Sequence, residues 1–443
     1  MIDTIYSLST GAGSSGVAII RLSGSASEEV LKKLTRKQTP KPRLASLRRI
    51  HSPVNQDAID EGIVIWFPGP NSYTGEDVVE FHVHGGPSIT EEVLKSISTI
   101  SSCRIAEPGE FTRRAFQSGK MDLTSAEAVA DLIDAKTIEQ RRQALKQFDG
   151  QLAGLYDEWR KQLIDLLAYA ESAIDFSDEE LPENINKTII HNILRIKDSI
   201  TQHIDDKMIG ERIRSGFHVT ILGAPNSGKS SLLNRLATRD AAIVSDIAGT
   251  TRDVIEVQMN LEGFAVIISD TAGIRDAQNE VEVEGVRRAR KSADEADLVV
   301  VVFDALDLPN ISEITSTYIT DKSLVLINKV DVLEHTLPSE INGKEILGVS
   351  AKTGEGFEEF QLKLNQDVKN YFRNNEQPVL TRVRHREALE EALVSLNRSS
   401  QAKLPELVAE DIRLAVRSIG KITGRVDVED VLDIIFNEFC IGK

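Results

Sequence analysis

The sequence has few cysteines and no long apolar run. Cys103 and Cys440 are the only cysteines among 443 residues, too few for a disulfide framework, and neither has neighbours at metal-ligand spacing. No apolar segment approaches the roughly 20 residues that a membrane-spanning helix needs. Met1 to Thr4 do not begin the basic and then apolar pattern of a signal peptide. We therefore expect a cytoplasmic protein without a membrane partner.

An excess of positive charge is also missing. The formal net charge of -17 argues against indiscriminate binding to nucleic acid, because such binding depends on phosphate neutralisation. Basic clusters at Arg43 to Arg49, Arg287 to Lys291 and Arg382 to Arg386 could form a local basic surface, although such clusters are more often solvated faces. No RNA-recognition or K-homology pattern is visible. The length fits two to four domains at roughly 150 residues each.

Residues 1–118 have the pattern of an α+β domain. The expected strands and helices lie at 16–22, 63–67, 78–84, 26–35 and 88–100. Glu80, His82 and His84 alternate along the third strand and should share one face. Two histidines at this spacing can bind a metal, but no third ligand is evident, so a hydrogen-bonding role is the favoured interpretation.

The rest of the chain alternates between helical and α/β patterns. Helical periodicity predicts a domain from 119–210, including one stretch from Leu123 through Phe148, and it returns at 380–443. Between them, residues 215–376 contain short apolar runs typical of a buried parallel sheet, with one antiparallel edge at 254–260. We expect a multidomain α/β protein in which a doubly wound domain is inserted into a discontinuous helical domain.

A phosphate-binding loop lies at Gly223 to Ser230, which match the pattern G-x-x-x-x-G-K-[ST]. A buried strand precedes the loop and a helix follows it, as this pattern requires. Backbone N–H groups and Lys229 can hold phosphate oxygens, and Ser230 can bind Mg²⁺.

Further short motifs follow in the order of a guanine-nucleotide switch. Two of these motifs, Gly249 to Asp253 and Asp270 to Gly273, can sense the terminal phosphate and its Mg²⁺. We expect Thr251 and Ser230 to be direct ligands of the Mg²⁺ ion. Asn328 to Asp331 follow a strand, and a carboxylate there can accept two hydrogen bonds from guanine, which adenine cannot offer. Ser350 to Lys352 complete the base pocket. We expect GTP to bind here, so the inserted domain is predicted to be a doubly wound P-loop GTPase domain.

The residue after the D-x-x-G motif is unusual for a hydrolase of this kind. Ile274 stands where Ras-like enzymes have a glutamine that positions water. Because isoleucine cannot orient water, hydrolysis must draw on another residue, a partner or a cation. The acidic stretch at 279–284 offers candidates, although it is also typical of a solvated helix start.

Several motifs together resemble the MnmE (TrmE) family of bacterial tRNA-modifying GTPases. They are the domain order, Arg-Leu-Ser-Gly at 21–24, His-Gly-Gly-Pro at 84–87 and the terminal Cys-Ile-Gly-Lys at 440–443. The resemblance implies a homodimer formed through the N-terminal domain and a tetrahydrofolate derivative (5-formyl- or methylene-tetrahydrofolate). It also implies an FAD-dependent partner of the MnmG type, with a heterotetramer, and modification of carbon 5 of the wobble uridine in tRNA with an aminomethyl or carboxymethylaminomethyl group.

The resemblance also assigns residues. By that resemblance the folate contacts are Arg21, Glu80, Lys120 and Lys443; the K⁺ ligands are Asn226, Ser245, Ile247 and Thr250; and Glu282 orients the attacking water. The full set expected at GTP is Asn226, Ser227, Gly228, Lys229, Ser230, Ser231, Ser245, Asp246, Ile247, Ala248, Gly249, Thr250, Thr251, Asp270, Thr271, Ala272, Gly273, Asn328, Lys329, Asp331, Ser350, Ala351 and Lys352.

Two alternatives stay open on the sequence. Cys440 can be a nucleophile toward the pyrimidine, or a buried and inert thiol between Phe439 and Ile441. The whole chain can be a tRNA-modifying GTPase or, alternatively, a GTP-driven ribosome or RNA assembly factor without modification activity. Folate binding would distinguish these two functions, because only the first predicts it.

Overall fold

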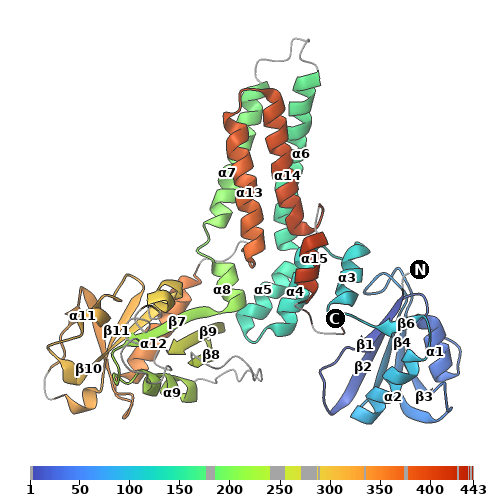
Figure 1. Cartoon of the computed structure of the whole chain (residues 1–443), viewed down its shortest axis with the longest axis horizontal. Coiled ribbons are helices and arrows are strands. Elements are labelled where there is room, and N and C mark those ends of the chain that lie inside the picture. Colours follow the sequence, from blue (N-terminus) through green and yellow to red (C-terminus); the bar gives the residue numbers. More distant parts are fainter. Residues whose placement is uncertain are drawn as a thin grey trace. The chain divides into compact units, whose positions relative to one another are not determined.

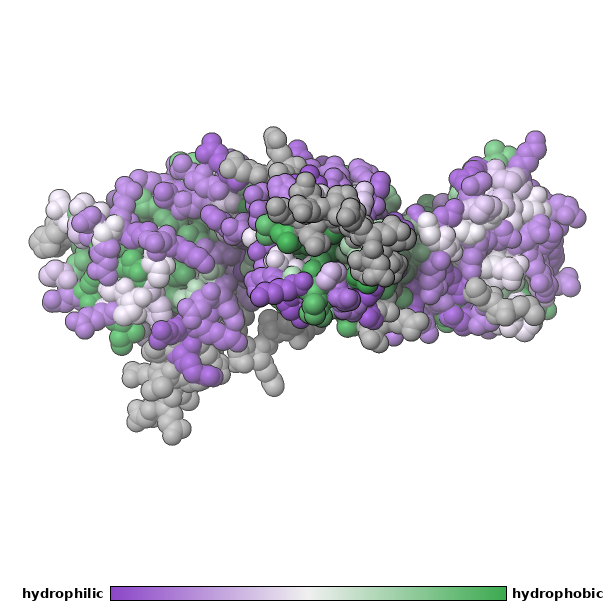
Figure 2. All heavy atoms as spheres, turned by 90° about the horizontal axis from the view of Figure 1, so that it is seen from above, coloured by the Kyte–Doolittle hydropathy of each residue, from purple (hydrophilic) through white to green (hydrophobic). Residues whose placement is uncertain are grey.

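The structure is a computed structural model that describes residues 3–175, 185–239, 255–270, 287, 290–333, 336–373, 378–426, 429–437, 439 and 442. The chain divides into two compact units, each built from separate segments. The first comprises Met1–Ala130, Gln147–Ile190 and Val394–Lys443, and the second comprises Asp131–Lys146 and His191–Leu393. Among the described residues no helix is long and apolar enough to cross a membrane. On the face seen in Figure 2, apolar side chains lie in small groups among hydrophilic ones.

The first unit contains a six-stranded sheet with the order β3-β4-β5-β2-β1-β6. Its strands are β1 (Thr4–Leu8), β2 (Ser15–Ser23), β3 (Ser46–His51), β4 (Ala58–Phe67), β5 (Val78–Gly85) and β6 (Cys103–Ile105). Helices α1 (Ser27–Thr35) and α2 (Pro87–Ser98) bury Val30, Leu31 and Val93 against one face. The expected strands and helices of the α+β domain are therefore confirmed, and β1, β3 and β6 are additional.

The opposite face of this sheet is only partly covered. Leu47 and Ile63 lie directly opposite each other in β3 and β4, and Ile63 in turn lies opposite His82. Leu47 is 65% exposed and Ile63 is 41% exposed. This face therefore presents apolar side chains beside Glu80 and His82.

Helices make up the rest of the first unit (Figure 1). They are α3 (Glu110–Gln117), α4 (Leu123–Asp134), α6 (Gln151–Asp175), α14 (Pro405–Thr423) and α15 (Glu429–Asn437). Helices α6 and α14 lie side by side, and ion pairs join Arg413 to Glu171 at 2.8 Å and Arg425 to Asp157 at 2.9 Å.

The expected continuous helix from Leu123 to Phe148 is wrong. Helix α4 ends at Asp134, and α5 (Ile138–Phe148) begins after a break. At the break, Gln140 N–H donates to Thr137 Oγ1 at 3.3 Å, and Thr137 N–H donates to Gln140 Oε1 at 3.2 Å. This reciprocal arrangement is a capping box, which starts a new helix by satisfying its first N–H groups.

The second unit contains a seven-stranded sheet with the order β12-β13-β11-β10-β7-β9-β8. Its strands are β7 (Phe217–Gly223), β8 (Ile255–Leu261), β9 (Phe264–Asp270), β10 (Leu298–Asp304), β11 (Ser323–Asn328), β12 (Glu340–Ile341) and β13 (Lys344–Val349). Strand β7 pairs in parallel with both β9 and β10, and β8 is antiparallel to β9. The doubly wound sheet and its antiparallel edge are confirmed.

The helices of the second unit are mostly longer than two turns. They are α7 (Ile185–Ile204), α8 (Ile209–Ser215), α9 (Lys229–Arg239), α11 (Glu313–Ser316), α12 (Phe357–Tyr371) and α13 (Val383–Gln401), besides α5 and the short 3-10 helices η1 (Ala305–Asp307) and η2 (Val330–Val332). The boundary between the two units falls within α4, α5, α7 and α13, so that Asp131 of α4 belongs to the second unit.

The basic cluster at Arg382 to Arg386 forms neither a basic surface nor a solvated face. The Arg386 side chain is 14% exposed and pairs with Asp206 at 2.8 Å and Glu211 at 3.0 Å. Arg382 pairs with Asp131 at 2.8 Å. These arginines are neutralised inside the second unit, because carboxylates from distant parts of the sequence meet them there.

Candidate functional site

The phosphate loop lies where the strand order of the second sheet reverses. Strands β8 and β9 follow β7 in the chain and lie on one side of it. Strands β10 and β11 come next and lie on its other side. Ligands of such sheets bind beyond the carboxyl ends of the strands at this switch point. The residues that end the neighbouring parallel strands are Asp270, Asp304, Asn328 and Val349. Three of these four carry polar side chains toward one edge of the sheet.

The loop backbone has a shape that depends on its glycines. Asn226 and Gly228 both have positive φ angles, 64° and 92°. A Cβ atom on Gly228 would lie 2.0 Å from Asn328 Nδ2, and one on Gly223 would lie 2.3 Å from Val302 O. These approaches explain why glycine is required at both positions. The fully buried hydroxyl of Ser227 has no hydrogen-bond partner in the described part of the chain.

Lys229 begins α9 and its ammonium group bends back over the loop. Nζ donates hydrogen bonds to Gly223 O at 3.0 Å and Ala224 O at 2.8 Å, and the residue is 5% exposed. Burial lowers the pKa of this ammonium group, while the Asp270 carboxylate opposes the shift. A phosphate in the loop would offer the buried cation a stronger, charged acceptor.

Ser230 and Asp270 meet at the position expected for Mg²⁺. Ser230 Oγ donates to Asp270 Oδ2 at 2.6 Å, and Asp270 is fully buried. A hydroxyl and a carboxylate this close are the oxygen donors that Mg²⁺ prefers, directly or through water. The donor set therefore fits Mg²⁺.

Asn328 connects the phosphate loop with the loop that follows β13. Its Nδ2 donates to Ser227 O at 2.8 Å, and its Oδ1 accepts from Ala351 N–H at 2.9 Å. Lys329 has a φ angle of 68°, and its ammonium group pairs with Asp304. Asp331 is exposed at the start of η2, where its carboxylate can meet a base. The two contacts of Asn328 bring the phosphate loop and Ala351 of the predicted base pocket together.

Sequence reasoning missed Arg235, which no nucleotide-binding motif includes. It lies on α9, and its guanidinium donates to Ala351 O, Lys352 O and Thr353 O. The motif residues are recognisable by type and spacing, whereas a contact between α9 and the loop after β13 spans more than 100 positions.

A second candidate site lies on the sheet of the first unit. A pocket of about 510 Å³ is lined by Arg43, Phe67, Asn71, Ser72, Tyr73, Val78 and Glu80. Glu80 Oε1 accepts from Arg21 Nε at 2.9 Å, and Glu80 Oε2 lies 3.2 Å from His82 Nε2. The Arg21 guanidinium lies 5.6 Å from the ring centre of Tyr73. Glu80 is thus a positioned carboxylate at the wall of an open pocket.

The histidines of β5 have the hydrogen-bonding role that the sequence favoured. His82 faces Glu80, and His84 Nδ1 lies 2.9 Å from Asp60 Oδ1. Among the residues that the structure describes, no three His, Cys, Asp or Glu side chains are grouped as metal ligands.

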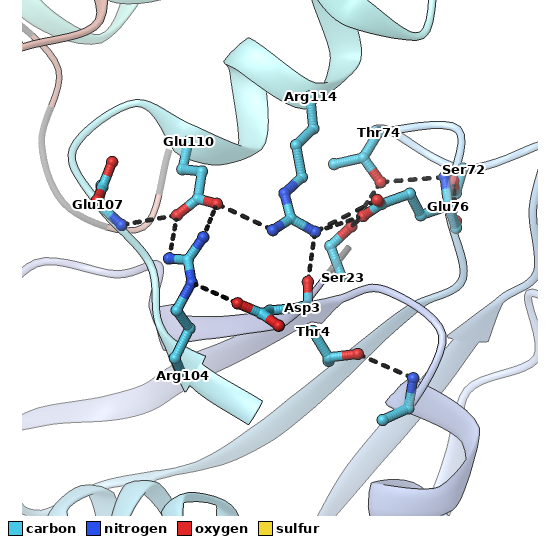
Figure 3. Close-up of polar contacts among 11 residues, drawn as sticks. Asp3, Thr4, Ser23, Ser72, Thr74, Glu76, Arg104, Glu107, Glu110 and Arg114 are labelled. Carbon is cyan, nitrogen blue, oxygen red and sulfur yellow. Dashed lines mark hydrogen bonds and ion pairs between the residues drawn. The ribbon is translucent and has the colours of Figure 1, made fainter. Parts of the chain in front are cut away.

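Figure 3 shows a polar network around Glu76, close in sequence to the pocket-lining residues 71–73. Arg114 of α3 donates to Glu76 at 3.0 Å, to Glu110 at 2.9 Å and to Asp3 O at 2.8 Å. Ser23 Oγ donates to the same Glu76 carboxylate, at Oε2, over 2.6 Å. This network, which sequence patterns did not reveal, fixes the end of the 71–76 loop that lines the pocket.

One further predicted folate position, Lys120, lies near this loop. A Cβ on Gly75 would lie 3.4 Å from Lys120 Cε, so the Lys120 side chain lies beside the loop. Ser9 Oγ donates to Gly442 O at 3.0 Å, which anchors the end of the chain next to β1. Ser7 of β1 is the register partner of Arg21.

Several predicted residues lie outside the described part of the chain. They are Ser245, Asp246, Ile247, Ala248, Gly249, Thr250, Thr251, Thr271, Ala272, Gly273, Glu282, Cys440 and Lys443.

Comparison with known proteins gives matches over the full length. A family model described as GTP-binding protein TrmE N-terminus matches residues 4–120, and one described as MnmE helical domain matches residues 123–440. The tRNA modification GTPase MnmE of Paramagnetospirillum magneticum is 50% identical over 443 residues, which is 100% of both chains. The protein of the same name from Maricaulis maris is 49% identical over 446 residues, again 100% of both.

A eukaryotic relative is similar over nearly the same length. The 5-taurinomethyluridine-[tRNA] synthase subunit GTPB3, mitochondrial, of Danio rerio is 43% identical over 469 residues, which cover 100% of this chain and 93% of that protein. The names of these relatives favour tRNA modification over the alternative of an assembly factor.

Proposed function

The chain belongs to the MnmE family of tRNA modification GTPases, and we propose that it modifies carbon 5 of the wobble uridine in a potassium-dependent GTPase cycle. The proposed additions to the family assignment are K⁺, a tetrahydrofolate derivative, an FAD-dependent partner of the MnmG type and a homodimer. The observation that supports the GTPase part most is the meeting of Lys229, Ser230 and Asp270 at one strand edge.

Within this proposal each group of the nucleotide site has a defined task. Lys229 holds the terminal phosphates, while Ser230 and Asp270, with Thr251, hold Mg²⁺. Asp331 selects guanine through its base N–H groups, and Ser350 to Lys352 form the rest of the base pocket. Glu282 orients the attacking water, because Ile274 lacks any group that could do so.

K⁺ is proposed to bind at Asn226, Ser245, Ile247 and Thr250. Asn226 is an exposed residue of the phosphate loop with a positive φ angle, so its side-chain oxygen is open to a cation bound at the loop. A bound monovalent cation would neutralise charge that develops on the phosphates, as an arginine finger does in other GTPases.

The folate derivative is proposed to occupy the pocket at Glu80, with Arg21, Lys120 and Lys443 as further contacts. A carboxylate already oriented by Arg21 and His82 suits a ring with adjacent N–H donors, such as a pterin. The folate would supply one carbon. Gly442 lies against β1, the strand that pairs with the strand of Arg21.

Binding of 5-formyltetrahydrofolate to the full chain, followed by calorimetry, tests this assignment. Glu80→Gln should weaken binding at least ten-fold, since it removes the charged acceptor. His84→Ala changes the same strand at a residue outside the pocket lining and should bind normally. Equal affinity of wild type and Glu80→Gln would contradict the proposal.

The partly covered sheet face supports a homodimer. Leu47 and Ile63 expose apolar side chains beside the pocket, on the face opposite to α1 and α2.

The biological reaction is tested by mass spectrometry of the wobble uridine in tRNA from cells that lack the gene. Unmodified carbon 5 is expected, and unchanged modification would overturn the proposed function.

A further inference from the structure

Arg235 makes a fork-shaped contact between α9 and the loop that follows β13. Its Nη1 donates to Ala351 O at 2.9 Å and to Lys352 O at 3.2 Å, and its Nη2 donates to Thr353 O at 3.2 Å. The guanidinium also lies over the ring of Phe357, 5.5 Å from its centre. One side chain thus fixes three consecutive carbonyl groups from two nitrogens of a rigid planar guanidinium, whereas a lysine has a single nitrogen.

The backbone of the loop is shaped to admit this side chain. Gly354 has a φ angle of 95°, and a Cβ atom there would lie 2.1 Å from Arg235 Nη2. Thr353 N–H donates to Ser350 Oγ at 3.0 Å, and Gly354 N–H donates to Ser350 O at 2.8 Å. The turn is therefore closed on itself and its carbonyl groups face Arg235.

Arg235 complements the contact that Asn328 makes from the other side. Asn328 joins Ser227 of the phosphate loop to Ala351 N–H, and Arg235 joins the helix that follows the phosphate loop to Ala351 O. The N–H and C=O groups of Ala351 are thus both tied to the phosphate-binding elements. The three carbonyl groups that accept from Arg235 belong to residues 351–353 and therefore to the base side of the site.

We propose that Arg235 is a positioning residue for guanine, which holds the loop of Ser350, Ala351 and Lys352 in its base-binding shape. This inference rests on the proposed assignment of that loop to the base pocket. Since Arg235 acts on this loop and the phosphates are held by Lys229 and Ser230, its loss should weaken nucleotide binding and leave the chemical step unchanged.

The test uses the full chain and a fluorescent GDP analogue. In Arg235→Ala the analogue should dissociate about ten-fold faster and KM for GTP should rise about ten-fold, the effect of losing one charge-assisted hydrogen bond. The kcat should stay within about two-fold. Arg235→Lys keeps the charge without the fork and should give an intermediate dissociation rate.

Two further variants keep the result interpretable. Gly354→Ala displaces the guanidinium from the other side and should also speed dissociation. Thr238→Ala is the control on the same helix, because the exposed Thr238 hydroxyl donates to Asn234 O at 2.7 Å, within α9 itself; its kinetics should match wild type. An unchanged dissociation rate in both Arg235→Ala and Gly354→Ala, or a fall in kcat at constant KM, would overturn the inference.

Failure of the underlying base-pocket assignment would look different. In that case Asp331→Asn would not transfer specificity from GTP to xanthosine triphosphate. If Asp331→Asn does transfer specificity and Arg235→Ala changes nothing, the positioning role alone is wrong.

Discussion

At the scale of single residues, the nucleotide site depends on short polar contacts between strand ends. Lys229 is held by two loop carbonyl groups, Ser230 by Asp270, and Asn328 by Ser227 and Ala351. Each contact satisfies a buried polar group that would otherwise be costly. The loop is therefore shaped for phosphate by its own hydrogen bonds.

Asp331 should decide which base binds. We predict that Asp331→Asn prefers xanthosine triphosphate to GTP, because an amide nitrogen can donate to the additional oxygen of xanthine but repels the N–H groups of guanine. The ratio of kcat/KM for the two nucleotides measures this preference. Asp307→Asn, an exposed carboxylate at the corresponding turn after β10, should keep GTP specificity. Retained GTP preference in Asp331→Asn would contradict the prediction.

The sequence predicts these site residues because each belongs to a motif with fixed spacing. Glu80 was assigned only through family resemblance, since one carboxylate on a strand has no distinctive pattern. Arg235 and Arg114 were not predictable, because their partners are set by tertiary contacts. The carbonyl groups that Arg235 binds belong to the backbone and leave no trace in residue type.

At the scale of elements, buried ion pairs fix α3 and the first part of α13. Glu110 of α3 accepts from Arg104 at 2.7 Å and from Arg114 at 2.9 Å. Arg386 of α13 pairs with Asp206 and Glu211. Breaking a buried pair leaves an uncompensated charge, so these residues should contribute far more than surface pairs.

Arg386→Met should lower the free energy of unfolding by about 3–5 kcal/mol, because the Asp206 and Glu211 carboxylates lose their partner. The midpoint of urea unfolding of the full chain measures the effect. Arg398→Met removes a pair with Asp411 in which the arginine is 57% exposed, and should cost less than about 1 kcal/mol. Equal shifts in the two variants would contradict the account.

Glu110 should make the first unit sensitive to acid. Burial favours a higher pKa for its carboxyl group, but hydrogen bonds from Arg104, the Glu107 N–H group and Arg114 outweigh burial and lower the pKa below its ordinary 4.5. The stabilisation is therefore present above the unfolded-state pKa and is lost as the pH falls through the lower folded-state value. We expect unfolding midpoints of wild type to fall between pH 5 and about pH 3 more steeply than those of Glu110→Gln; parallel curves would argue against it.

The elements themselves were largely predictable. The strands of the inserted sheet are continuous apolar runs such as Leu298 to Phe303, which burial on both faces requires. The break between α4 and α5 was missed, although Thr137 and Gln140 have the spacing of a capping box. Strand β3 was missed because Arg48 and Arg49 mask its alternation.

At the scale of the whole molecule, one chain contains a GTPase unit and a unit with the pocket at Glu80. Each compact unit is assembled from segments that are distant in sequence, and the GTPase sheet is inserted between helical segments. Sequence pattern suggested this insertion, because helical periodicity stops before Phe217 and returns after residue 380. We propose that a K⁺ ion bound at Asn226 neutralises the charge that develops on the phosphates, which an arginine finger does in other GTPases, while Glu282 orients the attacking water.

The most direct test of that claim compares GTP hydrolysis in KCl and NaCl at equal ionic strength. We predict at least ten-fold faster hydrolysis in KCl for wild type and loss of this difference in Asn226→Ala and Asn226→Gly. Asn226→Gly accommodates the φ angle of 64°, so it separates loss of the ligand from backbone strain. Equal rates of wild type in the two salts, or acceleration by K⁺ that persists in both variants, would contradict the account.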